Sequence, residues 1–174
     1  MINSEELKNI FYFGFNKACD WQLLDELEVL IQEGAINYSR KTISSKDNYF
    51  KILDKIKVID GLGPQGKGHM ALKEITRDYL ERLGKKALSE FQILGMHPDV
   101  ISSDKKIAIE CGITDPGGIL ILLSNQNILF VGVLPYPGDD NNLFLHKFSR
   151  GANFLDYKNW KLSKLREVFR QTEK

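Results

Sequence analysis

The chain has 174 residues, 43% of them hydrophobic and 27% charged, which suits one well-packed domain and is too short for two. A net charge of +1 gives no general basic surface for nucleic acid. The longest apolar stretch, residues 117–123, falls far below the roughly 20 residues that cross a bilayer, and the N-terminus lacks a signal-peptide pattern. The two cysteines lie far apart without a Cys/His cluster, so no zinc site is indicated. We therefore expect a single cytoplasmic domain with no membrane partner.

The first 60 residues are expected to form a helical N-terminal extension. A helix with Ser4 as its N-cap begins the chain, and a second helix is expected over residues 20–33, where Leu and Ile recur at helical spacing before Gly34. Residues 35–47 are polar and rich in serine, which predicts a loop. For residues 49–59 the sequence predicts either a helix or a strand.

An aromatic cluster in this extension raises the question of a partner. It consists of Phe11, Tyr12, Phe13, Phe15 and Trp21. Exposed apolar patches of this kind tend to mark contacts between proteins, so a homodimer is one expectation. The alternative is that these side chains cover one face of a sheet within the same chain.

Residues 61–174 are expected to form an α/β domain. Glycine-rich residues 61–68 predict a loop, and residues 69–83 a helix that ends at Gly84. Strands are expected over 87–93, 100–101 and 107–109, followed by a helix capped by Thr114 or Asp115 and a buried strand over 128–134. Residues 154–169 then predict an amphipathic terminal helix. The order from residue 61 to residue 134 is helix, strand, strand, strand, helix, strand.

Two acidic residues belong to neighbouring strands of this predicted domain. Pro98 favours a turn just before Asp99, and the apolar run 107–109 leads to Glu110. A hairpin turn over residues 102–106 brings the two carboxylates side by side. Because two adjacent carboxylates repel each other, a divalent metal ion is their natural partner.

The residues Pro98-Asp99 and Glu110-Cys111-Gly112 resemble the motif of the PD-(D/E)xK nuclease superfamily, which includes restriction endonucleases and archaeal-type Holliday junction resolvases. The resemblance implies a restriction-endonuclease-like αβββαβ core with a mixed central sheet. It also implies that Asp99 and Glu110 bind Mg²⁺ or Mn²⁺ during cleavage of DNA. In that family a lysine two positions after the Glu orients or activates the attacking water. Gly112 takes that position here, so a lysine from elsewhere would have to replace it.

Four residues of the predicted helix 69–83 and the loop before it are further candidates. In some branches of the family a Glu on the first core helix assists the metal, and Glu74 is the matching residue. Lys73 and Lys67 are the candidates for the missing lysine, and Lys67 and His69 are candidates for contact with DNA. Each also has an ordinary alternative, as a solvated surface side chain or, for His69, a helix cap.

Residues 61–68 also approach the phosphate-binding loop GxxxxGK[ST], because an apolar segment precedes them and a helix follows. However, Gly68 replaces the Ser or Thr whose hydroxyl binds Mg²⁺, and a phosphate loop would leave Asp99 without a role. A P-loop nucleotide-binding protein is therefore the weaker alternative.

Charge is distributed unevenly along the second half of the chain. Residues 98–145 contain six acidic and two basic side chains, whereas residues 146–174 contain eight basic and three acidic ones. An acidic centre beside a basic segment suits a metal site next to a phosphate-binding surface, and it equally suits an ordinary solvated helix. The sequence therefore predicts a metal-dependent DNA phosphodiesterase. Its main alternative is a nuclease fold that binds nucleic acid or protein without cleaving.

Overall fold

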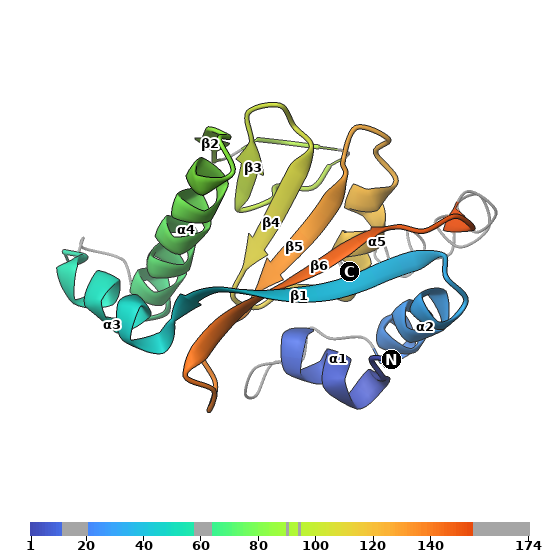
Figure 1. Ribbon diagram of the computed structural model, residues 1–174, viewed down its shortest axis with the longest axis horizontal. Coiled ribbons are helices and arrows are strands. Elements are labelled where there is room, and N and C mark those ends of the chain that lie inside the picture. Colours follow the sequence, from blue (N-terminus) through green and yellow to red (C-terminus); the bar gives the residue numbers. More distant parts are fainter. Residues whose placement is uncertain (12–20, 58–63, 90, 94, 155–174) are drawn as a thin grey trace.

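The computed structural model describes residues 1–11, 21–57, 64–89, 91–93 and 95–154. These residues form a mixed α/β structure with five helices and a six-stranded mixed sheet (Figure 1). In chain order, the elements are α1 (Ser4–Phe11), α2 (Trp21–Gln32), β1 (Ile36–Ser45), α3 (Lys46–Lys55), α4 (Pro64–Arg82), β2 (Ala87–Leu88), β3 (Val100–Ser102), β4 (Ile107–Cys111), α5 (Pro116–Leu123), β5 (Phe130–Leu134) and β6 (Asn142–Arg150).

The sheet has the strand order β1-β6-β5-β4-β3-β2. Strands β2, β3 and β4 are antiparallel neighbours, and β5 lies parallel to β4 because α5 forms the crossover between them. Strands β6 and β1 then continue the sheet in antiparallel fashion. From α4 to β5 the elements follow one another as helix, strand, strand, strand, helix, strand, the order expected from the sequence.

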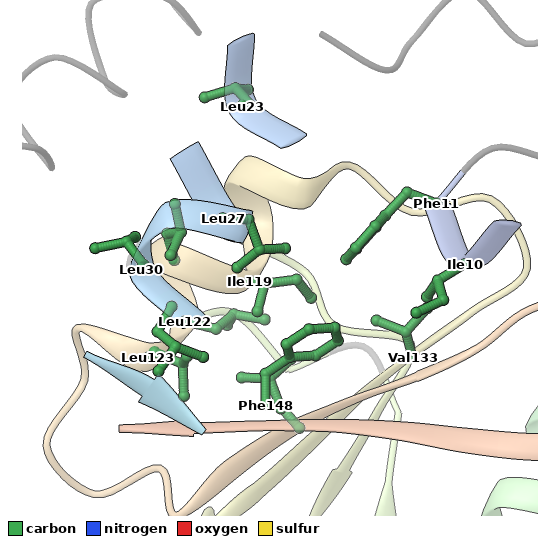
Figure 2. Packing of buried hydrophobic residues seen from close by; sticks show 14 of the residues in the cluster. Ile10, Phe11, Leu23, Leu27, Leu30, Ile119, Leu122, Leu123, Val133 and Phe148 are labelled. Atoms are coloured by element: carbon green, nitrogen blue, oxygen red, sulfur yellow. The ribbon is translucent and has the colours of Figure 1, made fainter. Parts of the chain in front are cut away.

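The core has two parts, one on each face of the sheet. On one face α1, α2 and α5 cover the sheet, and Figure 2 shows Phe11, Ile119 and Phe148 meeting there. The Phe11 and Phe148 rings lie 5.8 Å apart, which accounts for one member of the predicted aromatic cluster as core. Tyr12, Phe13 and Phe15 lie outside the described residues. On the other face α3 and α4 pack on β4 and β6 through a second cluster that includes Leu72, Ile75, Ile109 and Leu145.

The helix ends follow from local hydrogen bonds. Helix α1 is capped by Asn3 rather than by Ser4: the Glu6 amide donates to the Asn3 side chain, and the Asn3 amide donates to the Glu6 carboxylate. Helix α2 agrees with its prediction, and Gly34 follows it with a φ of 75°. Asp115 caps α5 by accepting from the Gly117 amide at 2.9 Å, as one of the two predicted alternatives had it.

Most of residues 35–47, predicted as a loop, form strand β1 (Ile36–Ser45), and residues 46 and 47 begin α3. Strand β1 pairs with β6 from Ile36 opposite Arg150 to Ser45 opposite Asn142, and β6 itself was not predicted. The first 60 residues are therefore more than a helical extension, since β1 belongs to the same sheet as the acidic pair. The burial of β1 explains the error: Ile36 and Ile43 are its buried residues, so its sequence lacks the regular alternation of a half-buried strand.

The bounds of other elements also differ from the predicted ones. Helix α4 begins at Pro64, five residues before the predicted start, and of the described residues in the predicted strand 87–93 only Ala87–Leu88 form a sheet strand. Strand β5 begins at Phe130, two residues later than predicted. The predicted helix 154–169 lies outside the described residues after Phe154. No helix in the described part of the chain has the length and apolar character of a membrane span.

Candidate active site

The β3–β4 hairpin places Asp99 directly beside Glu110. Val100 pairs with Ile109, so the next residue outward on each strand, Asp99 and Glu110, face each other at the end of the hairpin. Asp99 is held firmly: its Oδ2 accepts from the Cys111 amide at 2.7 Å, and its Oδ1 lies 2.9 Å from His69 Nε2. Because an ionised carboxylate only accepts, His69 Nε2 is the donor. The predicted pairing of the two acids is therefore present.

The two carboxyl groups share their surroundings unequally. Burial raises the pKa of Asp99. The hydrogen bonds from His69 and from the Cys111 amide, together with the charges of His69 and Lys73, lower it by more, so the pKa lies below its usual value. For Glu110, burial, the Asp99 charge and a hydrogen bond between the two carboxyl groups raise the pKa to about 8. At neutral pH the pair thus holds one proton and carries one negative charge.

Helix α4 brings Lys73 to the pair and leaves Glu74 away from it. Lys73 lies one turn after His69 on the same side of the helix, and its charge lowers the pKa of both Asp99 and Glu110. It acts without a direct ion pair to either carboxylate among the described residues. The Glu74 side chain is 49% exposed, and its Oε1 accepts from Arg77 at 2.6 Å. The structure therefore gives Glu74 a partner on the helix surface instead of the predicted place near the metal.

Lys67 lies in the first turn of α4, two residues before His69. Residues two apart leave a helix on different sides, so Lys67 does not share the side that carries His69 and Lys73. Residues 64–68, predicted as a loop, are helical, and α3 is the described element that precedes them. A phosphate loop needs an irregular turn after a strand, so this arrangement does not favour the P-loop alternative.

Tyr136 is the site residue that the sequence did not suggest. It follows β5, and its ring lies over Gly112, the residue in the position of the motif lysine. A Cβ built on Gly112 would lie 2.7 Å from Tyr136 Cε2 and 3.0 Å from its hydroxyl oxygen. On the other side, a Cβ built on Gly68 would lie 3.2 Å from Tyr136 Cε1 and 2.8 Å from the Tyr49 hydroxyl oxygen. The only sign in the sequence is the glycine itself, at a position where the family has a long side chain.

The Tyr136 ring also faces open space. It lines a cavity of about 500 Å³ together with Arg40, His146 and the loop that follows it. Burial is the first cause that raises the pKa of Tyr136, and Tyr49, Asp99 and Cys111 add to it. The pKa of Tyr136 therefore lies above its usual value of 10, and Asp99, Glu110 and Lys73 are not among the residues that line the cavity.

Comparison of the chain with protein-family models, with curated proteins and with solved structures finds no significant match. The chemistry of the site thus has to be inferred from its own residues. Within the described ranges, no group of three or more His, Cys, Asp and Glu side chains is arranged to hold a metal ion. Two adjacent carboxylates are nevertheless a donor set that fits Mg²⁺ or Mn²⁺, because such ions take one or two carboxylates and complete their shell with water and substrate oxygens.

Proposed function

We propose that this chain is a metal-dependent DNA phosphodiesterase with a restriction-endonuclease-like core. The observation that carries the proposal is the Asp99–Glu110 pair, two partly buried carboxyl groups pressed together with a positive charge from Lys73 beside them. Ionising both groups at once is unfavourable unless a cation offsets their repulsion. Carboxyl groups whose pKa values are shifted by burial and by a like charge are concentrated at functional sites.

The arrangement of the sheet supports the same conclusion. Helix α4, the antiparallel strands β2, β3 and β4, the crossover helix α5 and the parallel strand β5 occur in the order that the resemblance implies. The acids occupy corresponding places, with Asp99 just before β3 and Glu110 within β4. In this reading β6, β1 and the N-terminal helices are additions around the core.

The reaction is hydrolysis of a phosphodiester. The oxygen of a water molecule forms a new bond to phosphorus, the bond from phosphorus to one ester oxygen breaks, and that oxygen leaves with a proton as an alcohol. Asp99 and Glu110 would hold the cation, which supplies charge neutralisation on the phosphate and a lower pKa of water. His69 fixes the Asp99 carboxylate by its hydrogen bond. Lys73 supplies positive charge next to the pair, and Lys67, on another side of the first turn of α4, would contact the DNA backbone.

Cleavage assays on carboxylate variants test the proposal. Wild-type protein, Asp99→Asn and Glu110→Gln are incubated with supercoiled plasmid and with single-stranded, duplex and branched oligonucleotides, each with Mg²⁺ or Mn²⁺. We expect cleavage by the wild type and loss of at least about 100-fold in both variants, because each removes one anionic ligand. Asp25→Asn is the control, since it removes an exposed carboxylate on α2.

If the wild type cleaves none of these substrates with either metal, the proposed function is wrong. Retained binding of DNA under those conditions would then favour the alternative of a nuclease fold that binds without cleaving. Retained cleavage by both Asp99→Asn and Glu110→Gln would move the active site elsewhere.

A further inference from the structure

Position 112 cannot hold a lysine in this fold without a rearrangement. Gly112 has a φ of 78°, in the left-handed region that favours glycine. A side chain at this position would also begin 2.7 Å from a carbon of the Tyr136 ring, closer than van der Waals contact allows. The space of the motif lysine is therefore filled by an aromatic ring from another part of the chain.

The ring is held in that space from both sides. Gly68 of α4 and Gly112 after β4 each lie so close to Tyr136 that neither leaves room for a Cβ without movement of its neighbour. Pro135 and Pro137 flank Tyr136 in the sequence, and their fixed φ angles restrict the backbone that presents it. A tyrosine packed in this way keeps its hydroxyl group in one place.

That place is beside the acidic pair. The hydroxyl oxygen lies 3.0 Å from the point where a side chain of residue 112 would start, and the preceding residue, Cys111, donates its amide to Asp99 at 2.7 Å. A phenol hydroxyl group can donate a hydrogen bond, so the ring brings a donor to this place.

We propose that Tyr136 supplies a hydrogen-bond donor in the space of the missing motif lysine, donating from its hydroxyl to a non-bridging oxygen of the scissile phosphate beside Asp99 and Glu110. This inference rests on the proposed nuclease function. It divides the work of one lysine between two residues: Lys73 on α4 supplies the charge, and Tyr136 after β5 supplies the directed donor. Both lie next to the pair although neither belongs to the motif.

Removing the hydroxyl group alone is the first test. Tyr136→Phe keeps the ring and its packing, so we expect an unchanged melting temperature, a KM within about twofold of wild type and a kcat about 100-fold lower, the loss typical of one preorganised donor. Tyr79→Phe is the matched control, because Tyr79 is a similarly buried tyrosine on α4 that packs under the Lys41 ammonium instead of at the site. It should leave kcat unchanged.

Filling the space of the ring is the second test. Gly112→Ala adds a methyl group against Tyr136 at a φ of 78°, whereas Gly84→Ala adds one at a φ of 74° with nothing within 4 Å. The two variants share the backbone strain, so the extra loss of stability and of kcat in Gly112→Ala measures displacement of the ring. Gly112→Lys restores the lysine of the motif two positions after Glu110. It should nevertheless lower cleavage below wild type, because the new side chain displaces the Tyr136 ring.

The outcomes separate this inference from the function on which it rests. Absence of wild-type cleavage would overturn the proposed function and the inference with it. A wild type that cleaves, together with a fully active Tyr136→Phe, would overturn the role of the hydroxyl group alone. Cleavage above the wild-type rate by Gly112→Lys would show that the position simply lacked its lysine, and would also overturn the inference.

Discussion

Replacing Glu110 by Gln should stabilise the metal-free protein at alkaline pH. Burial and the neighbouring Asp99 carboxylate raise the pKa of Glu110 from its usual 4.5 to about 8. Between these values the folded chain keeps a proton that the unfolded chain releases, so the free energy of unfolding falls as the pH rises. Glutamine is uncharged throughout this range and has nearly the same shape, so the variant lacks this loss.

The size of the effect follows from the pKa difference. One pKa unit corresponds to about 1.4 kcal/mol, so a rise from 4.5 to about 8 sets an upper limit of about 5 kcal/mol. Glu110 is only partly buried, and water that reaches its carboxyl group reduces the penalty. We therefore expect a gain of about 2 kcal/mol for Glu110→Gln over wild type at pH 8, and almost none near pH 5.

Urea unfolding at pH 5, 6, 7 and 8 in the presence of EDTA measures this difference. The comparison between variant and wild type matters because His146 titrates in part of the same range: burial and then the charge of Arg40 lower its pKa to about 4, so its contribution falls as the pH drops below 6.5. That contribution is common to both proteins and cancels in the difference. The downward shift of Asp99 acts only as the pH falls below its usual value of 3.8, outside the measured window.

Added Mg²⁺ or Mn²⁺ should reverse the order of stability. The cation replaces the proton on Glu110 and stabilises the wild type by mass action, whereas Glu110→Gln offers one anionic ligand fewer and gains less. Parallel curves of stability against pH for the two proteins in EDTA would refute the reasoning. They would mean that Glu110 does not share its environment with Asp99 as the structure shows.

Three further substitutions test separate parts of the molecule. Lys73→Met keeps the stem and helix propensity but deletes the charge, so cleavage should fall at least tenfold without a lower melting temperature; unchanged cleavage would assign Lys73 to the helix surface. Lys67→Met should act on affinity, reducing the slope of log Kd against log salt for DNA by about one, and an unchanged slope would remove it from the DNA contact. Arg150→Ala removes guanidinium hydrogen bonds of 2.8–3.1 Å to the carbonyls of residues 123, 125 and 126, so urea unfolding should show a loss of about 2–3 kcal/mol. A loss below 0.5 kcal/mol would contradict that role.

The hairpin that carries the acidic pair was predictable because its pattern is local. The apolar residues of β4 run without interruption, a short polar turn precedes them, and the pairing of Val100 with Ile109 follows from the length of that turn. Strand β6 was not predicted because its two faces pack into different core clusters. Leu143 and Leu145 belong to one cluster, and Phe148 belongs to the other. Apolar residues on both sides of a strand hide the period of two on which such a prediction depends.

Within the site, spacing along one helix was informative and contact between distant segments was not. His69 and Lys73 share a side of α4 because they are four residues apart, but which side faces the acids depends on how the helix packs. Which of the two candidates Lys73 and Glu74 approaches the acids depends on the rotation of α4 on the sheet, which the packing of Leu72 and Ile75 fixes. Tyr136 follows Glu110 by more than twenty residues, and no periodicity connects a loop to the glycine that it covers.

The substitution at position 112 therefore has a different meaning in the fold than in the sequence. Compared with the motif that the sequence resembles, the glycine would mark the loss of a catalytic side chain. In three dimensions, a Cβ built on Gly112 would lie 2.7 Å from the Tyr136 ring and 3.0 Å from the hydroxyl oxygen at the end of that ring. The φ of 78° favours glycine at position 112 in any case, but if the site were only a remnant nothing would favour glycine at position 68 within α4, because a larger residue there with a smaller one at 136 would pack equally well. The combination is instead what a displaced donor requires: an aromatic stem of fixed length, two neighbours small enough to admit it, and a lysine on α4 that adds the charge a phenol lacks.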